Sequence, residues 1–208
     1  MLKRLLLLSL DKEIIVVDDG STDGTSEKIN RFLSIIKILR HETNQGKGVA
    51  LRTGLAHAAG DFIFFCDADL ECDIDQVSTL FDCISQNGAD VVYGSRFIDY
   101  QPRKKIIHYL GNRFLTWLTD CLFDAKLTDM ETAYKMFRSN VVKNMVLTSR
   151  RFEIEPEITA KILKQGIEIR ETPIAYDPRV KSEGKKIKYR DGLMAVKVLI
   201  REKITRAK

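Results

Sequence analysis

DFIFFCDADLE, residues 61–71, is the stretch from which the fold can be predicted. Five consecutive apolar residues, 62–66, are typical of a short strand that is buried on both faces of a sheet. Asp67, Ala68 and Asp69 follow directly, so two carboxylates lie at the carboxyl end of the predicted strand. Ligands of open α/β sheets collect at that end, and paired carboxylates suit a hard divalent cation that also contacts substrate phosphates. We therefore predict a Mg²⁺ or Mn²⁺ site here, although a solvated turn would account equally well for so short a motif.

A second apolar run ends in the same way. Residues 13–17 predict a strand, and Asp18, Asp19 and a turn that contains Gly20 come directly after it. Apolar residues at helical spacing predict a helix over about 25–36, followed at once by another strand. Polar groups are thus expected at the carboxyl ends of two strands.

Lys47 lies between two glycines in the segment HETNQGKG, residues 41–48. The segment is not a Walker phosphate loop, because Gly48 follows the lysine where that loop needs Ser or Thr. It is not a dinucleotide fingerprint either, because Leu51 stands where Gly or Ala is needed. The glycines nevertheless allow the backbone to approach a ligand closely.

Strands and helices alternate along the remaining chain. The patterns predict strands at 89–93, near 127–135 and at 167–172, and helices at 74–84, 106–123, up to 164 and from 191. This alternation is typical of an α/β fold with a mostly parallel sheet covered by helices on both faces. The length of 208 residues fits one domain, 1–190, followed by an amphipathic helix and tail, 191–208.

An acidic cluster, Glu153-Ile-Glu-Pro-Glu157, begins the helix that ends at 164. Carboxylates are stabilised near the amino-terminal end of a helix by the helix dipole. This local effect is sufficient to explain most of the cluster.

The charge is distributed unevenly along the chain. Residues 1–100 carry a net charge of −6 and residues 101–208 a net charge of +11. A basic half beside a cation site suggests a surface that meets phosphates, an anionic bilayer or nucleic acid, unless the charge is merely solvated. Nucleic acid is disfavoured because aromatic residues are not interleaved with the Lys and Arg runs. The cysteines form no Cys-x-x-Cys pair, which indicates a reducing, cytoplasmic compartment.

Five short motifs occur in a fixed order and are informative together. They are Val16–Thr25, Asn44–Gly48, Asp67–Asp69, Gly94–Arg96 and Thr128–Tyr134. In this order they resemble glycosyltransferase family two, and within it the dolichyl- and polyprenyl-phosphate sugar synthases. The resemblance covers about residues 13–203. It implies a GT-A fold, a GDP- or UDP-sugar donor, a divalent cation, a polyprenyl phosphate acceptor and inversion at the anomeric carbon.

The resemblance also implies roles on the donor side. Asp18 and Asp19, with Gly20, would contact the base and ribose, and Lys47 would belong to the donor site. Asp67, Ala68 and Asp69 would face the diphosphate, with the two aspartates holding the cation. Glu71, where relatives commonly have Gln, would add a third carboxylate to the metal site.

On the acceptor side, Arg96 and Arg113 would bind the acceptor phosphate, since a guanidinium matches phosphate oxygens. Asp129 and Arg96 are the catalytic candidates. An ionised phosphate needs no strong base, so Asp129 would orient groups or balance charge. A sugar or protein hydroxyl as acceptor is the alternative, and Asp129 would then have to take a proton.

The chain departs from the family pattern at its front and in its membrane contacts. A strand and helix that usually precede residue 13 are absent, so we expect Leu5–Leu10 to be the end of a helix. A truncated start would leave a gap in the sheet and a weakened donor site, and a catalytically silent nucleotide-binding module is a third hypothesis. Relatives often carry carboxyl-terminal membrane spans, so binding here would be peripheral, through basic and amphipathic surface at the cytoplasmic membrane face.

Overall fold

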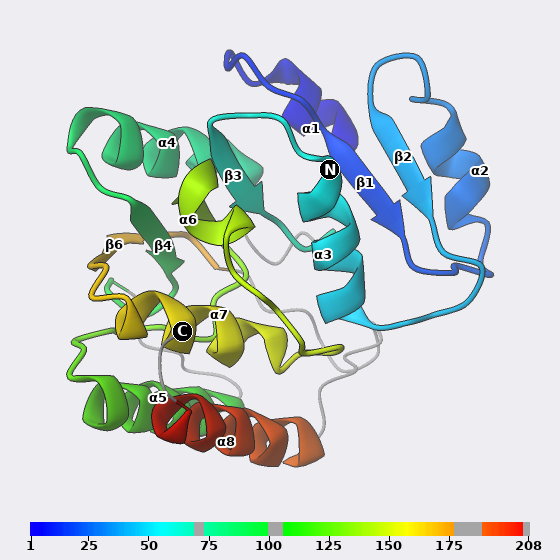
Figure 1. Cartoon of the computed structure of the whole chain (residues 1–208). Coiled ribbons are helices and arrows are strands. Elements are labelled where there is room, and N and C mark those ends of the chain that lie inside the picture. The colour runs from blue at the N-terminus through cyan, green and yellow to red at the C-terminus, as the bar shows by residue number, and fades with distance from the viewer. Residues whose placement is uncertain (69–72, 100–105, 177–188, 206–208) are drawn as a thin grey trace.

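The computed structural model describes residues 1–68, 73–99, 106–176 and 189–205. Its strands form two sheets (Figure 1). One is a parallel pair, β1 (Ile15–Asp18) and β2 (Lys37–Arg40). The other has four strands in the order β3-β5-β4-β6, which are β3 (Phe62–Phe65), β5 (Lys135–Arg138), β4 (Val91–Ser95) and β6 (Ile169–Pro173).

In the four-stranded sheet, β3, β4 and β6 run in the same direction, as the prediction of a mostly parallel sheet requires, but β5 runs against them. β4 and β6 are parallel, but β5 is antiparallel to both of its neighbours. The reason lies in where the chain returns to the sheet. Tyr134 and Thr132 hydrogen-bond to Gly94 at the carboxyl end of β4, so β5 begins at that edge and must run back.

The two sheets are separate. Among the described residues, β1 and β3 do not pair with each other, and β2 is the strand that pairs with β1. Helix α2 (Thr25–Asn30) connects β1 to β2, and helix α3 (Lys47–His57) packs against β1. The helix predicted over 25–36 ends at Asn30, because the chain continues in tight turns such as Ile35 N to Phe32 O.

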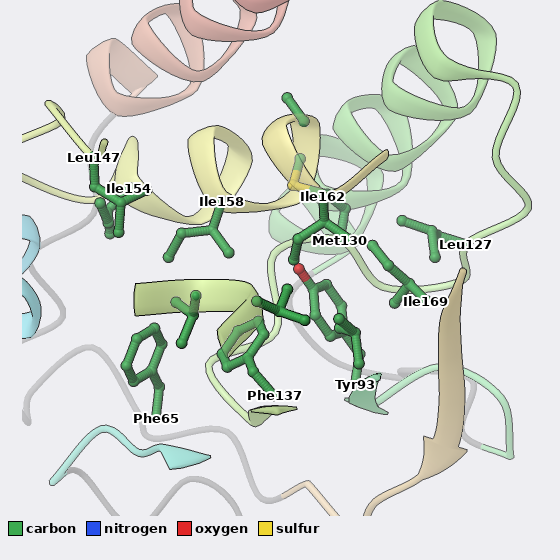
Figure 2. Close-up of a cluster of buried hydrophobic side chains, with 14 of the residues drawn as sticks. Phe65, Tyr93, Leu127, Met130, Phe137, Leu147, Ile154, Ile158, Ile162 and Ile169 are labelled. Atoms are coloured by element: carbon green, nitrogen blue, oxygen red, sulfur yellow. The ribbon is translucent and has the colours of Figure 1, made fainter. Parts of the chain in front are cut away.

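One face of the four-stranded sheet carries the larger hydrophobic core (Figure 2). Alternate strand residues such as Phe65, Tyr93 and Phe137 point to this face. Helix α7 (Ile154–Lys164) covers it with Ile158 and Ile162, both fully buried. Helices α5 (Ile106–Phe123) and α8 (Tyr189–Ile204) form the next layer, and α6 (Ser139–Lys143) follows β5.

The intervening strand residues face the opposite way, as the period of two in a strand requires. Val92 and Met136 contribute to a second core beneath the short helix η1 (Ile74–Gln76) and helix α4 (Val77–Gln86). Leu5 of helix α1 (Leu2–Leu7) packs against this core, as do Leu8 and Leu10 after the helix. A helix is therefore present near the front as expected, but it ends at Leu7 and does not include residues 8–10. Helices therefore cover both faces of the sheet, as predicted.

Helix α8 packs against α5 and α7, and Ala195, Val198 and Leu199 are buried there. The boundary at residue 190 stays a prediction. No helix in the described part of the chain combines the length and apolar character that a bilayer crossing needs. The basic runs at residues 103–105 and 179–186 lie outside the described residues.

Candidate active site

Lys47 lies between two carboxylates at the carboxyl end of β3. Its ammonium nitrogen is 2.7 Å from Asp67 Oδ2 and 2.9 Å from Glu155 Oε1. The lysine side chain is 16% exposed, whereas that of Asp67 is 36% exposed and so open to solvent. Burial alone would lower the pKa of Lys47, but the charges of Glu155 and Asp67 raise it well above its ordinary value. The ammonium group is therefore charged at every physiological pH.

The backbone contacts of Gly46 and Gly48 place Lys47 between Asp67 and Glu155. Gly46 and Gly48 pack on the segment 149–150, and the Gly48 amide donates to Arg150 O at 2.9 Å. A Cβ at Gly48 would lie 2.4 Å from Ser149 O, so no larger residue fits without movement. Glu157 holds this segment in turn, since its carboxylate accepts from the amides of Thr148 and Ser149.

Glu155 joins Lys47 to a second buried lysine. Its other oxygen pairs with the ammonium group of Lys135, a residue of β5 that is fully buried. Burial alone would raise the pKa of Glu155, but Lys135 and Lys47 lower it to about 2. The helix dipole was therefore an insufficient explanation of the acidic cluster, because Glu155 pairs with Lys135 and Lys47 and Glu157 accepts hydrogen bonds from the segment before the helix.

Asp18 and Asp19 stabilise the two loops that flank this cluster. Asp18 is buried and accepts from the Ser21 amide and the Ser26 hydroxyl. Asp19 accepts from the amides of Gln45 and Gly46 and contacts His41 Nδ1 at 2.7 Å. These contacts hold the loop after β1 against the loop that carries Lys47.

Gly20 has a φ of +75°, and a Cβ there would lie 2.7 Å from Asn44 N. A glycine is thus required where the loop after β1 meets the loop that carries Lys47. The structure brings Asp19, Gly20, Lys47 and Asp67 to one edge of the fold. Whether they contact a donor stays a prediction.

Arg96 and Asp129 form the second part of the site. Arg96 Nε lies 2.6 Å from Asp129 Oδ2, and Arg96 Nη2 lies 2.7 Å from Asp129 Oδ1. The Arg96 amide and Asn112 Nδ2 also donate to this carboxylate, which is completely buried. With four donors on its two oxygens, Asp129 is placed to orient Arg96.

Glu171, on β6, fixes the segment from which Asp129 projects. Its carboxylate accepts from the Thr128 amide at 2.7 Å and from the Asp129 amide at 2.9 Å. Burial raises the pKa of Glu171, and the hydrogen bonds from Thr128 oppose this change. Arg113, on α5, donates to Thr128 O at 2.9 Å and is exposed, so both predicted phosphate-binding arginines are attached to the same segment.

Glu131 is the chemically unusual carboxyl group of the site. Its Oε1 is buried and has no hydrogen-bond partner among the described residues. Burial raises the pKa of Glu131 to about 7, opposed by Lys135 and reinforced by Glu155, while Arg96 and Asp129 exert smaller opposite effects. These neighbours belong to both clusters, so Glu131 lies where the Lys47 cluster and the Arg96 pair meet.

Asp67 fits the role of a cation ligand, since it is partly exposed and presents hard oxygen atoms at a strand end. Ala68 is exposed beside it, whereas Asp69 and Glu71 lie outside the described residues. Within the described ranges, no three His, Cys, Asp or Glu side chains converge as a metal site. A cation with one or two protein carboxylates and substrate phosphates is the ordinary arrangement for Mg²⁺.

Sequence reasoning missed Lys135, Glu155 and Glu171 as site residues. Lys135 could have been recognised from the sequence. It begins the apolar strand KMF, and a lysine buried in such a strand needs a charged partner. Glu155 and Glu171 could not be recognised in this way, since their partners lie at least twenty residues away in the chain.

The fold is the GT-A fold, an α/β arrangement in which helices cover a central sheet. The chain belongs to glycosyl transferase family 2, whose family model matches residues 1–146. It is 28% identical over 168 residues to the glycosyltransferase AglJ of Haloferax volcanii, covering 80% of this chain and 54% of that protein. It is also 32% identical over 170 residues to the uncharacterized protein MJ1222 of Methanocaldococcus jannaschii, covering 78% and 69%. The chain thus spans about half of AglJ and two thirds of MJ1222.

The fold is similar to that of glucosyl-3-phosphoglycerate synthase from Mycobacterium tuberculosis. The TM-score is 0.71 at 17% identity, covering 99% of this chain and 72% of the synthase, in a crystal structure with Mn²⁺, UDP and phosphoglyceric acid. A second structure of that synthase, with Mg²⁺ and UDP, gives a TM-score of 0.70 at 19% identity, covering 95% and 71%. At these identities the similarity confirms the predicted GT-A fold.

Proposed function

We propose that this protein transfers a sugar from a GDP- or UDP-sugar to a polyprenyl phosphate, with inversion at the anomeric carbon and with Mg²⁺ or Mn²⁺. An oxygen of the acceptor phosphate attacks the anomeric carbon and forms the new C–O bond. The bond from that carbon to the diphosphate breaks, and the nucleoside diphosphate leaves with the electron pair. An ionised phosphate supplies the nucleophile, so no proton has to be removed from the acceptor.

The donor half of the proposal is supported by Lys47 and Asp67. They would place an ammonium group and a carboxylate-bound cation at the carboxyl end of β3, where a diphosphate needs positive charge. When bound, the cation stabilises the negative charge that develops on the leaving diphosphate. Asp69 and Glu71 would complete its protein ligands.

The acceptor half depends on one observation, the two-point contact that fixes the Arg96 guanidinium on Asp129. A guanidinium held in one orientation is suited to bind phosphate oxygens, and Arg113 adds a second beside it. Two arginines attached to one short segment favour an anionic acceptor over a neutral one.

A lipid acceptor is supported by the apolar surface of α5. Ile107, Leu110, Phe114 and Trp117 recur at helical spacing and are at least half exposed. Helix α8, which packs beside α5, also exposes Leu193, Ile200 and Ile204. Exposed apolar residues in such number suit a peripheral contact with a bilayer, which we place at the cytoplasmic face.

A paired assay tests the acceptor. The protein is incubated with Mn²⁺ and labelled UDP- or GDP-sugars, with vesicles that contain either a polyprenyl phosphate or the corresponding polyprenol. We expect labelled lipid only with the phosphate, and its loss in Asp67→Asn. Trp117→Asp should reduce sedimentation with anionic vesicles at least fivefold, whereas Lys126→Asp, at an exposed site beyond α5, should have a smaller effect. Transfer to polyprenol, or no transfer with any donor, would contradict the proposal.

A hydroxyl acceptor is a second candidate, and Glu131 favours it. Asp129 has four donors on its carboxylate, but Glu131 has an unpaired oxygen and a pKa of about 7. Such a carboxylate can take a proton from a hydroxyl near neutral pH. Transfer to a sugar or protein hydroxyl that rises with pH through about 7, and loses this rise in Glu131→Gln, would establish this alternative.

A further inference from the structure

The ammonium group of Lys47 forms an ion pair with Asp67, the carboxylate that a metal ion would need as a ligand. It lies 2.7 Å from Asp67 Oδ2, and among the described residues Asp67 is the predicted metal ligand. We propose that Lys47 is a resident counter-ion of Asp67, which a divalent cation replaces only when the donor diphosphate takes up the ammonium group. This inference rests on the proposed function, because it assumes a cation at Asp67.

The contact is built into the fold rather than made by a loose surface side chain. Gly46 and Gly48 seat the backbone on either side of Lys47 against residues 149–150. Glu155 holds the ammonium group from its buried side at 2.9 Å, and the Lys47 side chain is only 16% exposed. The lysine is thus held beside Asp67 by the fold itself.

Among the described residues, the four that form the ion pairs of this cluster carry balanced charges. Asp67 and Glu155 contribute two negative charges, and Lys47 and Lys135 contribute two positive ones. A divalent cation bound to Asp67 would lie within a few ångströms of the ammonium group, since Mg²⁺ binds oxygen at about 2.1 Å. The two positive charges repel each other at this distance, so the ammonium group opposes metal binding as long as Asp67 is its partner.

The diphosphate of the donor would relieve the repulsion between the Lys47 ammonium group and the metal ion. Its oxygens give Lys47 a new anionic partner and give the metal ion its remaining ligands. Because binding free energies are reciprocal, the diphosphate must then strengthen metal binding by the same factor by which the metal strengthens diphosphate binding. The structure thus predicts weak binding of the metal alone and strong joint binding with the diphosphate.

Binding of Mn²⁺ to the full chain tests this, with free Mn²⁺ measured by electron paramagnetic resonance. Titrations without nucleotide and with excess UDP or GDP are compared, and Mn²⁺ binding by the nucleotide alone is measured in parallel. The variants are Lys47→Met, which removes the counter-ion, and Lys47→Arg, which keeps the charge. Lys3→Met removes the same charge from an exposed position on α1 and serves as the matched control.

We expect Lys47→Met to bind Mn²⁺ alone at least tenfold more tightly than the unchanged protein, and to gain less from added nucleotide. Lys47→Arg and Lys3→Met should bind Mn²⁺ alone as weakly as the unchanged protein, and adding Asp67→Asn to Lys47→Met should remove the gain. Equal Mn²⁺ affinity in the unchanged protein and Lys47→Met would overturn the inference while leaving the metal site intact. Absence of Mn²⁺ binding in every variant, with or without nucleotide, would overturn the metal site and this inference together.

Discussion

The carboxylate of Asp129 binds Arg96 through both of its oxygens, at 2.6 and 2.7 Å, and is itself completely buried. The pair joins the end of β4 to the segment that precedes β5. Its carboxylate is fully occupied by donors, so its role is to hold the guanidinium in place. The consequences for stability and for acceptor binding can be separated by mutation.

Asp129→Asn should destabilise the protein by about 3–5 kcal/mol, because it leaves a partly buried guanidinium without its charged partner. Urea unfolding followed by circular dichroism measures the change. Arg113→Met is the matched control, since it removes an exposed arginine with one bond to Thr128 O and should cost about 1 kcal/mol or less. Equal losses in the two variants would show that the Arg96 pair has no special structural role.

Gly48→Ala should lower stability by about 1–3 kcal/mol, because the new Cβ would lie 2.4 Å from the backbone oxygen of Ser149. Gly111→Ala provides the comparison. Gly111 lies within α5 and has no atom within 4 Å of the added Cβ, so alanine should stabilise the helix by about 0.5–1 kcal/mol. Thermal unfolding measures both, and a neutral Gly48→Ala would mean that the loop carrying Lys47 moves freely on residues 149–150.

Glu131→Gln should change the pH dependence of stability. The folded protein holds the Glu131 proton up to a pH of about 7, whereas the unfolded chain releases it near 4.5. Between these values the folded state binds more protons, so this group lowers stability as pH rises, and its full cost is present above about 7. The variant lacks this cost and should gain stability relative to the unchanged protein across that window, by at most about 3 kcal/mol.

Urea unfolding at several pH values between 4 and 8 measures the Glu131 effect. Glu168→Gln makes the same chemical change at an exposed position and serves as the matched control. Curves for Glu131→Gln that run parallel to those of the unchanged protein would contradict the assigned environment of this carboxyl.

The strands at residues 15–18 and 62–65 were predictable because short, uninterrupted apolar runs have few other uses in a protein of this size. The same runs placed Asp18, Asp19 and Asp67 correctly at strand ends. The direction of β5 was not predictable, since periodicity says nothing about which edge of the sheet the chain returns to. It was set by the hydrogen bonds of Thr132 and Tyr134 to Gly94, which are contacts across forty residues of chain.

The candidate site was predicted in its acidic half and missed in its supporting half. Aspartates that directly follow strands can be recognised from the local sequence. The roles of Glu155 and Glu171, in contrast, depend on partners that are distant in the chain, such as Lys135 and Thr128. The cost of burying a charge without a partner explains why these partners exist, but not which residues they are.

The antiparallel course of β5 has one more consequence. The chain leaves the sheet after Ser95, at the carboxyl end of β4, and returns beside that end at Tyr134. Residues 96–133 are therefore a long connection between two neighbouring strands, and Arg96, Arg113 and Asp129 belong to it. A change in the length of this connection leaves the pairing of β4 with β5 unchanged. Under the proposed function, this architecture would allow the acceptor-binding segment to vary between relatives while the proposed donor site is retained.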